Sequence, residues 1–206
     1  MRLEATYKIT TPMFLAGAEQ ENAPELRPPS FKGLLCFWFR AVALPKLGNW
    51  KEVQKLEKEL LGSTDQQSSF FLDLKIEEAD KIRFSDFSNK FGLIYLGYGL
   101  FRGRSQRPYY RGNSTFTLRL LSKKRKIAEE AKVLLPLAMK ALGLFGGAGA
   151  RSRRGFGSLS LLSLSLDGRE IWQAPTNVEE LAASQREFLS TLGIKAAGGS
   201  KLPDYT

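Results

Sequence analysis

The order of two kinds of hydrophobic spacing along the chain constrains its fold more than any other feature. Four segments have strand-like patterns, and two segments among them repeat apolar residues with the spacing of an amphipathic helix. The order is strand, helix, strand, strand, helix, strand, which predicts an α+β, ferredoxin-like (split βαβ, RRM-like) fold with insertions. The strands are predicted at residues 3–9, 70–76, 115–121 and 158–166, and the helices at 31–44 and 127–142.

Proline and glycine mark the expected ends of the helices. Pro45 is expected to end the first helix and Gly143 the second, because both residue types interrupt helices. The charged, periodic residues 50–61 predict a further helix that ends at Gly62. Residues 82–98 hold shorter, strand-like segments interrupted by glycine. The middle of the chain is therefore expected to contain insertions.

The last predicted core strand, residues 158–166, carries two local signals. Its leucine spacing changes phase at Leu162, which predicts a β-bulge. Asp167 and Gly168 are typical of a tight hairpin turn, and they lead into a short strand at residues 169–172. The two strands are therefore expected to form a hairpin.

The C-terminal part of the chain differs from the rest. Residues 176–192 have the apolar spacing of an amphipathic helix, and the chain from Gly193 onward is expected to form a flexible tail. We therefore expect one ferredoxin-like domain over residues 1–172, with a glycine-rich loop at 146–157. A C-terminal helix and tail are expected over residues 173–206.

The chain has no histidine, which excludes several classes of enzyme. Histidine is the usual general base near neutral pH, so Ser-His-Asp, Cys-His and HExxH chemistry is impossible here. The single cysteine, Cys36, lies in an apolar run and is expected to be a buried small hydrophobe. No apolar stretch is long enough to span a membrane. We therefore expect a soluble, cytoplasmic protein with no membrane partner.

The formal net charge of +10, from 31 Lys and Arg against 21 Asp and Glu, favours a polyanionic partner. Most of the excess lies in residues 102–126, which contain no acid. Tyr109 and Tyr110 lie within this basic run, and such a mixture allows phosphate pairing and base stacking. The alternative is a solvated basic loop whose tyrosines belong to the core. The cations of the run are Arg102, Arg104, Arg107, Arg111, Arg119, Lys123, Lys124, Arg125 and Lys126.

A second basic cluster lies within the glycine-rich residues 146–157. Glycines let a backbone fold closely around a ligand, and successive N–H groups can form anion-binding concavities. The Walker motif is absent, and the loop follows a helix and precedes a strand, which is the reverse of a dinucleotide-binding fingerprint. Residues 154–157 match only the start of the RNP1 motif, so an aromatic stacking platform of that kind is not expected.

The first predicted helix carries three consecutive aromatic residues, Phe37, Trp38 and Phe39. Consecutive residues point about 100° apart on a helix, so at least two of the three are expected in the core. Lys32, near the helix N-terminus, is unfavourable with the helix dipole unless an anion is bound, which favours a phosphate contact. Arg40 either extends the same basic face or only covers apolar surface with its alkyl chain.

Three motifs together resemble a known family. They are residues 11–18 (TPMFLAGA), residues 27–33 (RPPSFKG) and the glycine-rich loop. With them, the chain resembles the RAMP superfamily of CRISPR-associated proteins, and within it the family of first subunits of the Cmr (type III-B) effector complex. The resemblance implies a ferredoxin-like fold and RNA binding by the glycine loop and nearby basic residues. The ribonucleoprotein so implied uses a guide RNA to recognise target RNA in antiviral defence.

The resemblance and the basic clusters together define a set of candidate RNA-binding residues. They lie in residues 27–40, in the basic run and in the glycine loop. The set comprises Arg27, Lys32, Arg40, Arg102, Arg104, Arg107, Tyr109, Tyr110, Arg111, Gly146, Gly147, Gly149, Arg151, Arg153, Arg154, Gly155 and Gly157.

We expect a non-catalytic RNA-binding subunit that uses no cofactor and no metal. Its expected partners are single-stranded RNA, as guide RNA, target RNA or both, and other RAMP subunits. One alternative is a RAMP-type endoribonuclease acting on guide or target RNA, although metal-dependent cleavage needs clustered carboxylates and the acids of this chain are scattered. Another alternative is a basic structural protein such as a ribosomal component, which has no need of a glycine loop.

Overall fold

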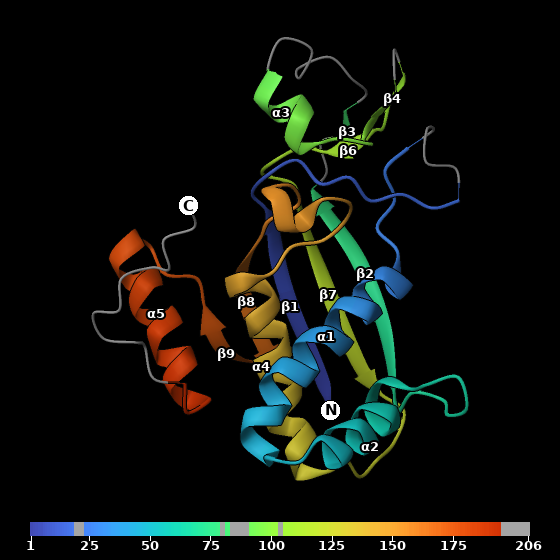
Figure 1. The fold of residues 1–206 in the computed structure, drawn as a ribbon. Helices are drawn as coiled ribbons and strands as arrows, with labels where there is room; N and C mark the ends of the chain where they lie inside the picture. Colours follow the sequence, from blue (N-terminus) through green and yellow to red (C-terminus); the bar gives the residue numbers. More distant parts are fainter. Residues whose placement is uncertain (19–22, 79–80, 83–90, 103–104, 195–206) are drawn as a thin grey trace. The chain divides into compact units, whose positions relative to one another are not determined.

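The structure is a computed structural model that describes residues 1–18, 23–78, 81–82, 91–102 and 105–194 (Figure 1). The chain divides into two compact units, Met1–Gln173 and Ala174–Thr206. Within the described residues, no helix combines the length and the apolar composition needed to cross a membrane.

The first unit is built on a five-stranded antiparallel sheet with the strand order β2-β7-β1-β8-β9. The chain order β1, α1, β2, β7, α4, β8 and the spatial order β2-β7-β1-β8 of these four strands are those of the ferredoxin-like fold. The predicted fold class is therefore confirmed. The elements are β1 (Arg2–Ile9), α1 (Pro28–Leu47), α2 (Trp50–Leu61), β2 (Phe70–Glu78), β7 (Thr115–Ser122), α4 (Glu129–Phe145), β8 (Leu159–Leu166) and β9 (Arg169–Gln173).

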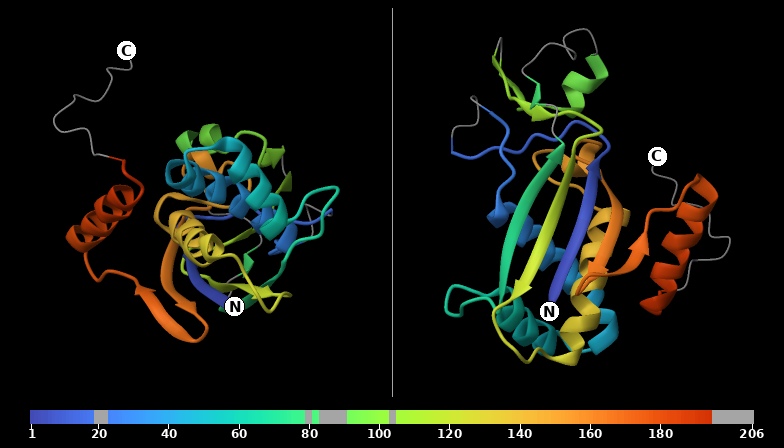
Figure 2. Two further views of the ribbon diagram at one scale, coloured as in Figure 1. Left: turned by 90° about the horizontal axis from the view of Figure 1, so that it is seen from below. Right: turned by 180° about the vertical axis from the view of Figure 1, so that it is seen from behind.

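The helices α1 and α4 cover one face of the sheet, and the core lies between them and the strands (Figures 1 and 2). Every second residue of β1 and β7 is buried, as the alternating pattern predicts. The rings of Tyr7 and Phe116 stack with centroids 5.4 Å apart, and Phe31 of α1 meets Phe116 edge-on at 5.0 Å. The Tyr7 hydroxyl donates to the Met139 carbonyl at 2.8 Å, which joins the sheet to α4.

The ends of two helices differ from the sequence prediction. Helix α1 continues through Pro45 and ends at Gly48, which has a left-handed φ of 67°. It begins at Pro28, because proline is tolerated in the first turn, where its missing N–H has no helical partner. Helix α2 and its end at Gly62 are confirmed. Helix α4 runs past Gly143 to Phe145.

Gly143 is a packing residue and not a helix stop. A Cβ built on it would lie 2.4 Å from Leu161 Cβ and 2.8 Å from the Leu161 backbone nitrogen. The glycine therefore lets α4 approach the backbone of β8 closely. The spacing pattern of a helix does not reveal this role, because it depends on the strand that the helix crosses.

Gly143→Ala is expected to destabilise the protein although alanine favours helix. The helical gain of about 1 kcal/mol is smaller than the overpacking cost of roughly 1–3 kcal/mol. Gly33→Ala is the matched control, since Gly33 lies inside α1 with nothing within 4 Å of its Cβ position. We expect this control to raise stability by about 0.5–1 kcal/mol. Urea unfolding measures both; equal changes in the two variants would contradict the packing role.

An insertion of short elements connects β2 to β7. Residues 91–96 form a helix, so the strand-like expectation for this part is wrong. The expectation for residues 83–90 lies outside the described residues. The elements are β3 (Lys81–Ile82), α3 (Phe91–Leu96), β4 (Phe101–Arg102), β5 (Ser105–Gln106) and β6 (Tyr109–Tyr110).

The β8–β9 hairpin follows the prediction in both details. Thr6 pairs with Ser163 while Tyr7 pairs with Leu161, so Leu162 is the extra residue of a β-bulge. Asp167 and Gly168 both have positive φ, as a tight hairpin turn requires.

The second unit contains α5 (Val178–Thr191), which confirms the predicted C-terminal helix. The Asn177 side chain caps it by accepting from the Glu180 backbone nitrogen at 2.8 Å. The expected tail falls mostly on residues 195–206, outside the described residues.

Candidate nucleic-acid interface

The glycine-rich loop, residues 146–157, is held against the chain that follows β1. The Ala150 backbone nitrogen donates to the Phe14 carbonyl at 2.8 Å, and the Gly157 nitrogen donates to the Pro12 carbonyl at 2.9 Å. The loop also contains a short 3-10 helix, η1 (Ser152–Arg154). These hydrogen bonds fix its path at one end of the sheet (Figure 1).

Most glycines of the loop serve its own packing. A Cβ at Gly157 would lie 1.9 Å from the Ala148 carbonyl oxygen, and one at Gly149 would lie 2.5 Å from the Phe14 carbonyl oxygen. Among the loop's glycines, only Gly155 has open space at its Cβ position. The expectation that these glycines exist to close around a ligand therefore needs correction, because backbone contacts within the protein already require most of them.

An open groove of about 390 Å³ lies where the loop meets helices α1 and α4. Aromatic rings form much of its wall. Phe37 meets Trp38 edge-on with centroids 5.3 Å apart, and Trp38 lies 6.4 Å from Phe145, the last residue of α4. Phe37 is 48% exposed and Phe145 41% exposed. The lining residues are Leu34, Phe37, Trp38, Phe145, Gly146, Gly147, Ser152 and Arg153.

The loop contributes a cation to this groove. The Arg153 guanidinium lies over the Phe37 ring, 5.6 Å from its centroid, in a cation–π geometry. None of the described residues that line the groove is acidic. The groove therefore offers flat aromatic faces and a positive charge side by side, a combination that suits a planar, negatively charged ligand such as a nucleotide.

The aromatic run of α1 was predicted wrongly. Only Phe39 belongs to the core, whereas Phe37 and Trp38 line the groove. The signal was present in the sequence for Phe37, because Phe31, Leu35 and Phe39 define one helical face and residue 37 points to another side. Trp38, seven residues after Phe31, lies at the edge of the buried face. Phe145 and Ser152 were also missed, since only the fold brings the end of α4 and the loop to α1.

Tyr109 and Tyr110 are core residues, which corrects the prediction that they stack on bases. They are 3% and 1% exposed. The ring centroids of Tyr109 and Phe14 lie 5.1 Å apart. The Tyr110 hydroxyl donates to the Pro24 carbonyl at 3.1 Å and accepts from the Leu26 nitrogen at 3.2 Å. Burial raises the pKa of Tyr110. The two tyrosines therefore have the core position that the alternative gave them.

A smaller hollow of about 190 Å³ lies beside the same loop. It brings together two sequence-predicted residues, Arg107 and Gly149. Leu15 and Ala16 from the first motif complete its wall with Phe14, Pro108 and Ala150. The 11–18 motif and the glycine loop, which are far apart in sequence, thus share one surface.

Several candidate cations are engaged within the protein. Arg40 forms two hydrogen bonds to the Glu57 carboxylate, at 2.6 and 2.7 Å, and this bonding raises the pKa of Arg40. The Arg27 Nε atom lies 3.9 Å from Glu25 Oε1, within the range of an ion pair. The Arg151 side chain donates to the Tyr98 carbonyl oxygen. These contacts reduce the charge or the freedom that each side chain has for a ligand.

The remaining candidates differ in exposure. Arg153, Arg154 and Arg111 are exposed, and Lys32 is partly buried on α1. For Arg102, the structure describes only the backbone, within β4, and Arg104 lies outside the described residues.

Cys36 is only partly buried, so its expected place in the core needs correction. Its side chain lies next to the ion pair that Arg40 of α1 forms with Glu57 of α2. Burial, with a smaller contribution from Glu57, raises the pKa of the Cys36 thiol to about 11.

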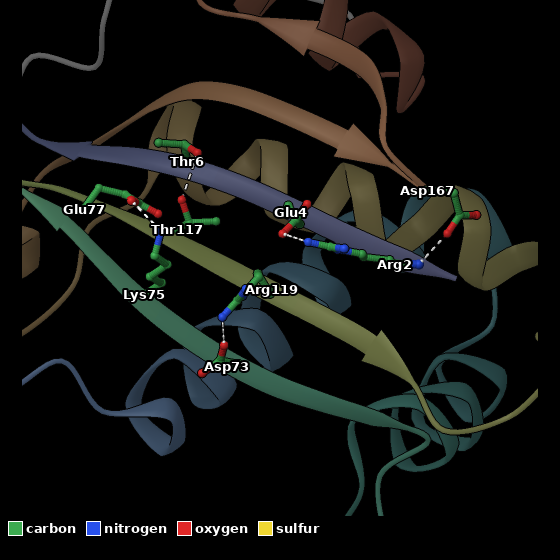
Figure 3. A network of polar contacts seen from close by, with 9 residues as sticks. All are labelled: Arg2, Glu4, Thr6, Asp73, Lys75, Glu77, Thr117, Arg119 and Asp167. Carbon is green, nitrogen blue, oxygen red and sulfur yellow. Dashed lines mark hydrogen bonds and ion pairs between the residues drawn. The ribbon is translucent and has the colours of Figure 1, made fainter.

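The sheet face that α1 and α4 leave uncovered carries paired charges of both signs (Figures 2 and 3). Phe71 lies on the same face, 60% exposed, with Lys123 Nζ 4.4 Å from its ring centroid. Arg119 pairs with Asp73, and the Thr6 and Thr117 hydroxyls lie 3.0 Å apart. The shallow hollow on this face, about 330 Å³, has no aromatic residue among its described lining. This hollow therefore lacks the aromatic stacking platform that an RNA-recognition motif carries on its sheet, and the exposed Phe71 lies outside its lining. The other ion pairs of this face are Arg2–Glu4 and Lys75–Glu77.

Groups of three or more Asp, Glu or Cys side chains that could hold a metal ion do not occur in the part of the chain that the structure describes.

Comparison with known protein families matches residues 6–160 to the RAMP superfamily. A curated relative, CRISPR system Cmr subunit Cmr1-1 from Pyrococcus furiosus, is 29% identical over 194 residues, which cover 88% of this chain and 56% of the relative. Cmr1-2 from the same organism is 30% identical over 176 residues, which cover 75% of this chain and 91% of the relative. This chain thus spans little more than half the length of the first relative.

The solved structures that are similar to this chain include a crystal structure and a cryo-EM structure. The crystal structure of Cmr1 from Pyrococcus furiosus in its apo form matches with a TM-score of 0.66 and 25% identity, over 94% of this chain and 60% of that one. A cryo-EM structure of the type III-B Cmr-beta complex bound to cognate target RNA contains a chain that matches with a TM-score of 0.62 and 14% identity. The match covers 95% of this chain and 62% of that one. The second similarity concerns the fold alone.

Proposed function

Since this chain belongs to the RAMP superfamily, we propose that it is a non-catalytic RNA-binding subunit of a type III-B CRISPR ribonucleoprotein. The curated relatives, which are named subunits of the Cmr system, support this placement. The single observation that carries the RNA-binding part is the groove at the glycine loop, in which Phe37, Trp38 and Arg153 line one acid-free wall.

The groove would hold single-stranded RNA by two kinds of contact. A base would stack on the exposed Phe37 ring and the partly buried Trp38 ring. Such stacking discriminates little between bases, because every base has a π-face. The exposed Arg153 and Arg154 would pair with the phosphates on either side of that base. Binding would therefore be weakly sequence-specific and dependent on salt.

The double variant Arg153→Ala with Arg154→Ala is expected to flatten the salt dependence of RNA binding. Each lost phosphate contact reduces the slope of log affinity against log salt by about 0.7 for single-stranded RNA. We therefore expect a loss of about 1.4 if both arginines contact phosphates. Fluorescence anisotropy with a labelled single-stranded RNA over a range of salt concentrations measures the slope.

The matched control for this experiment is Arg125→Ala with Lys126→Ala. These neighbouring cations are exposed, lie after β7 and do not line the groove. The control removes the same charge and is expected to leave most of the slope intact. Equal flattening by both double variants would mean that net charge, and not this groove, holds the RNA.

The non-catalytic part of the proposal has its own test. The pure chain is expected to leave RNA intact during incubation with Mg²⁺ or Mn²⁺. Cleavage that a single Asp substitution removes, while binding persists, would instead support the endoribonuclease alternative. Copurified RNA with a repeat-derived end, together with other RAMP subunits, would support assembly into the complex.

A further inference from the structure

A cluster of exposed apolar side chains lies on α3 and the turn that follows it. Tyr95 and Tyr98 are each 76% exposed, and Ile94 and Leu96 are 37% and 41% exposed. Single exposed apolar residues are common on protein surfaces, but four within five positions form a contiguous patch. Neither the basic run nor the aromatic groove includes these residues.

The patch is held in place and does not belong to a loose loop. Leu100, which follows the turn, is 3% exposed and packs in a small core with Phe14, Tyr109 and Phe156. Leu93 of α3 packs against the same core. The buried Tyr109 thus has a structural role, since it helps to anchor the segment that presents the two exposed tyrosines.

A hydrogen bond joins the glycine loop to this patch. The Arg151 side chain donates to the carbonyl oxygen of Tyr98. A Cβ at Gly99 would lie 3.7 Å from Arg151 Nη2, so the turn sits close against the guanidinium. Arg151 thus fixes Tyr98 beside the loop, while Arg153, two residues later, lies over Phe37 of the groove. The loop connects two aromatic surfaces.

The charge around the patch indicates what it can bind. Residues 87–128, which contain α3, include no Asp or Glu, and neither do residues 131–166, which contain the glycine loop. Exposed rings beside the guanidinium group of Arg151 complement a ligand that carries both planar rings and negative charge. An apolar protein partner would cover Ile94 and Leu96 but would offer no negative charge to the arginine beside the patch.

We propose that Tyr95 and Tyr98 form a second base-stacking site for single-stranded RNA, connected to the first through the glycine loop. The proposal rests on the proposed function, because it extends the path of the same RNA. A strand that crosses the loop would place one base on Phe37 and Trp38 and another on the tyrosines. Sequence-tolerant stacking suits tyrosine, whose ring is large and flat.

The double variant Tyr95→Ser with Tyr98→Ser tests the proposal in the full chain. It is expected to weaken binding of a labelled single-stranded RNA by about 5- to 150-fold, which corresponds to the loss of one stacked base. The salt slope is expected to stay unchanged, because no cation is removed. The variant Tyr95→Phe with Tyr98→Phe keeps the rings and is expected to bind like the original protein.

The matched control is Ile94→Ser with Leu96→Ser, which removes apolar surface from the same patch without removing a ring. It is expected to retain RNA affinity. An equal loss in this control would overturn stacking in favour of a general apolar contact. Unchanged RNA affinity in the Tyr-to-Ser variant, alone or together with loss of a copurifying protein, would also overturn the proposal.

The outcomes separate this proposal from the proposed function. If the original protein binds RNA and only the groove variants weaken it, the tyrosine site fails and the proposed function stands. If the original protein binds no single-stranded RNA, both fail. A melting temperature within a few degrees of the original would show that the Tyr-to-Ser variant is folded, as expected for two side chains that are 76% exposed.

Discussion

The double variant Phe37→Ala with Trp38→Ala is expected to bind single-stranded RNA about 5- to 150-fold more weakly for each base that stacks on the rings of the groove. The physical reason is the loss of the two rings that form the open wall of the groove. Arg153 would also lose the ring beneath its guanidinium. Anisotropy titrations at fixed salt measure the affinity, and the salt slope is expected to change little.

Trp50→Ala is the control for this experiment. Trp50 begins α2, is 49% exposed and does not line the groove, so it matches Phe37 in character and in exposure. The control is expected to bind RNA as the original protein does. If Trp50→Ala weakens binding as much as the double variant does, the groove is not the stacking site.

Gly157→Ala is expected to destabilise the fold by about 4 kcal/mol or more. Its φ of +61° is unfavourable for alanine, at a cost of roughly 1–2 kcal/mol. In addition, the new Cβ would lie 1.9 Å from the Ala148 carbonyl oxygen, so the loop must move and distort its hydrogen bonds to residues 12–14. At about 2–4 °C per kcal/mol, the melting temperature is expected to fall by about 8–16 °C.

The variant Gly155→Ala separates the energetic cost of backbone strain from the cost of steric overlap. Gly155 has a φ of +85° but no atom within 4 Å of its Cβ position. Its replacement is expected to cost only the strain, roughly 1–2 kcal/mol. Calorimetry on the two variants gives the comparison; similar losses in both would contradict the packing role of Gly157.

The fold could be predicted where local chemistry decides the structure. Alternation over residues 3–9 and 115–121 predicted two central strands, and the phase change at Leu162 predicted the bulge. The errors arose where a residue's role depends on a distant segment. Gly143 has the local properties of a helix stop, but β8 crosses it and makes it a packing residue.

For the candidate site too, the sequence predicted local features and missed those that depend on a distant segment. Residues 102–126 contain no acid in sequence, yet Asp73 of β2 pairs with Arg119 and Glu59 pairs with Lys124 in space. The tyrosines of that run are buried, because the chain after β1 packs on Tyr109 through Phe14 and pairs with Tyr110 through Met13. The glycine loop and Arg153 were identified from sequence, whereas the groove needed the end of α4 beside α1, which only the fold provides.

The central claim is that RNA lies on the glycine-loop end of the protein and not on the open sheet face. Cross-linking of a 4-thiouridine-labelled single-stranded RNA, followed by mass spectrometry of the peptides, tests it most directly. The account predicts cross-links within the peptides that carry Phe37 and Trp38 and within residues 146–157. Cross-links confined to the polar face of Figure 3, at residues such as Thr6, Lys75 and Thr117, would contradict it.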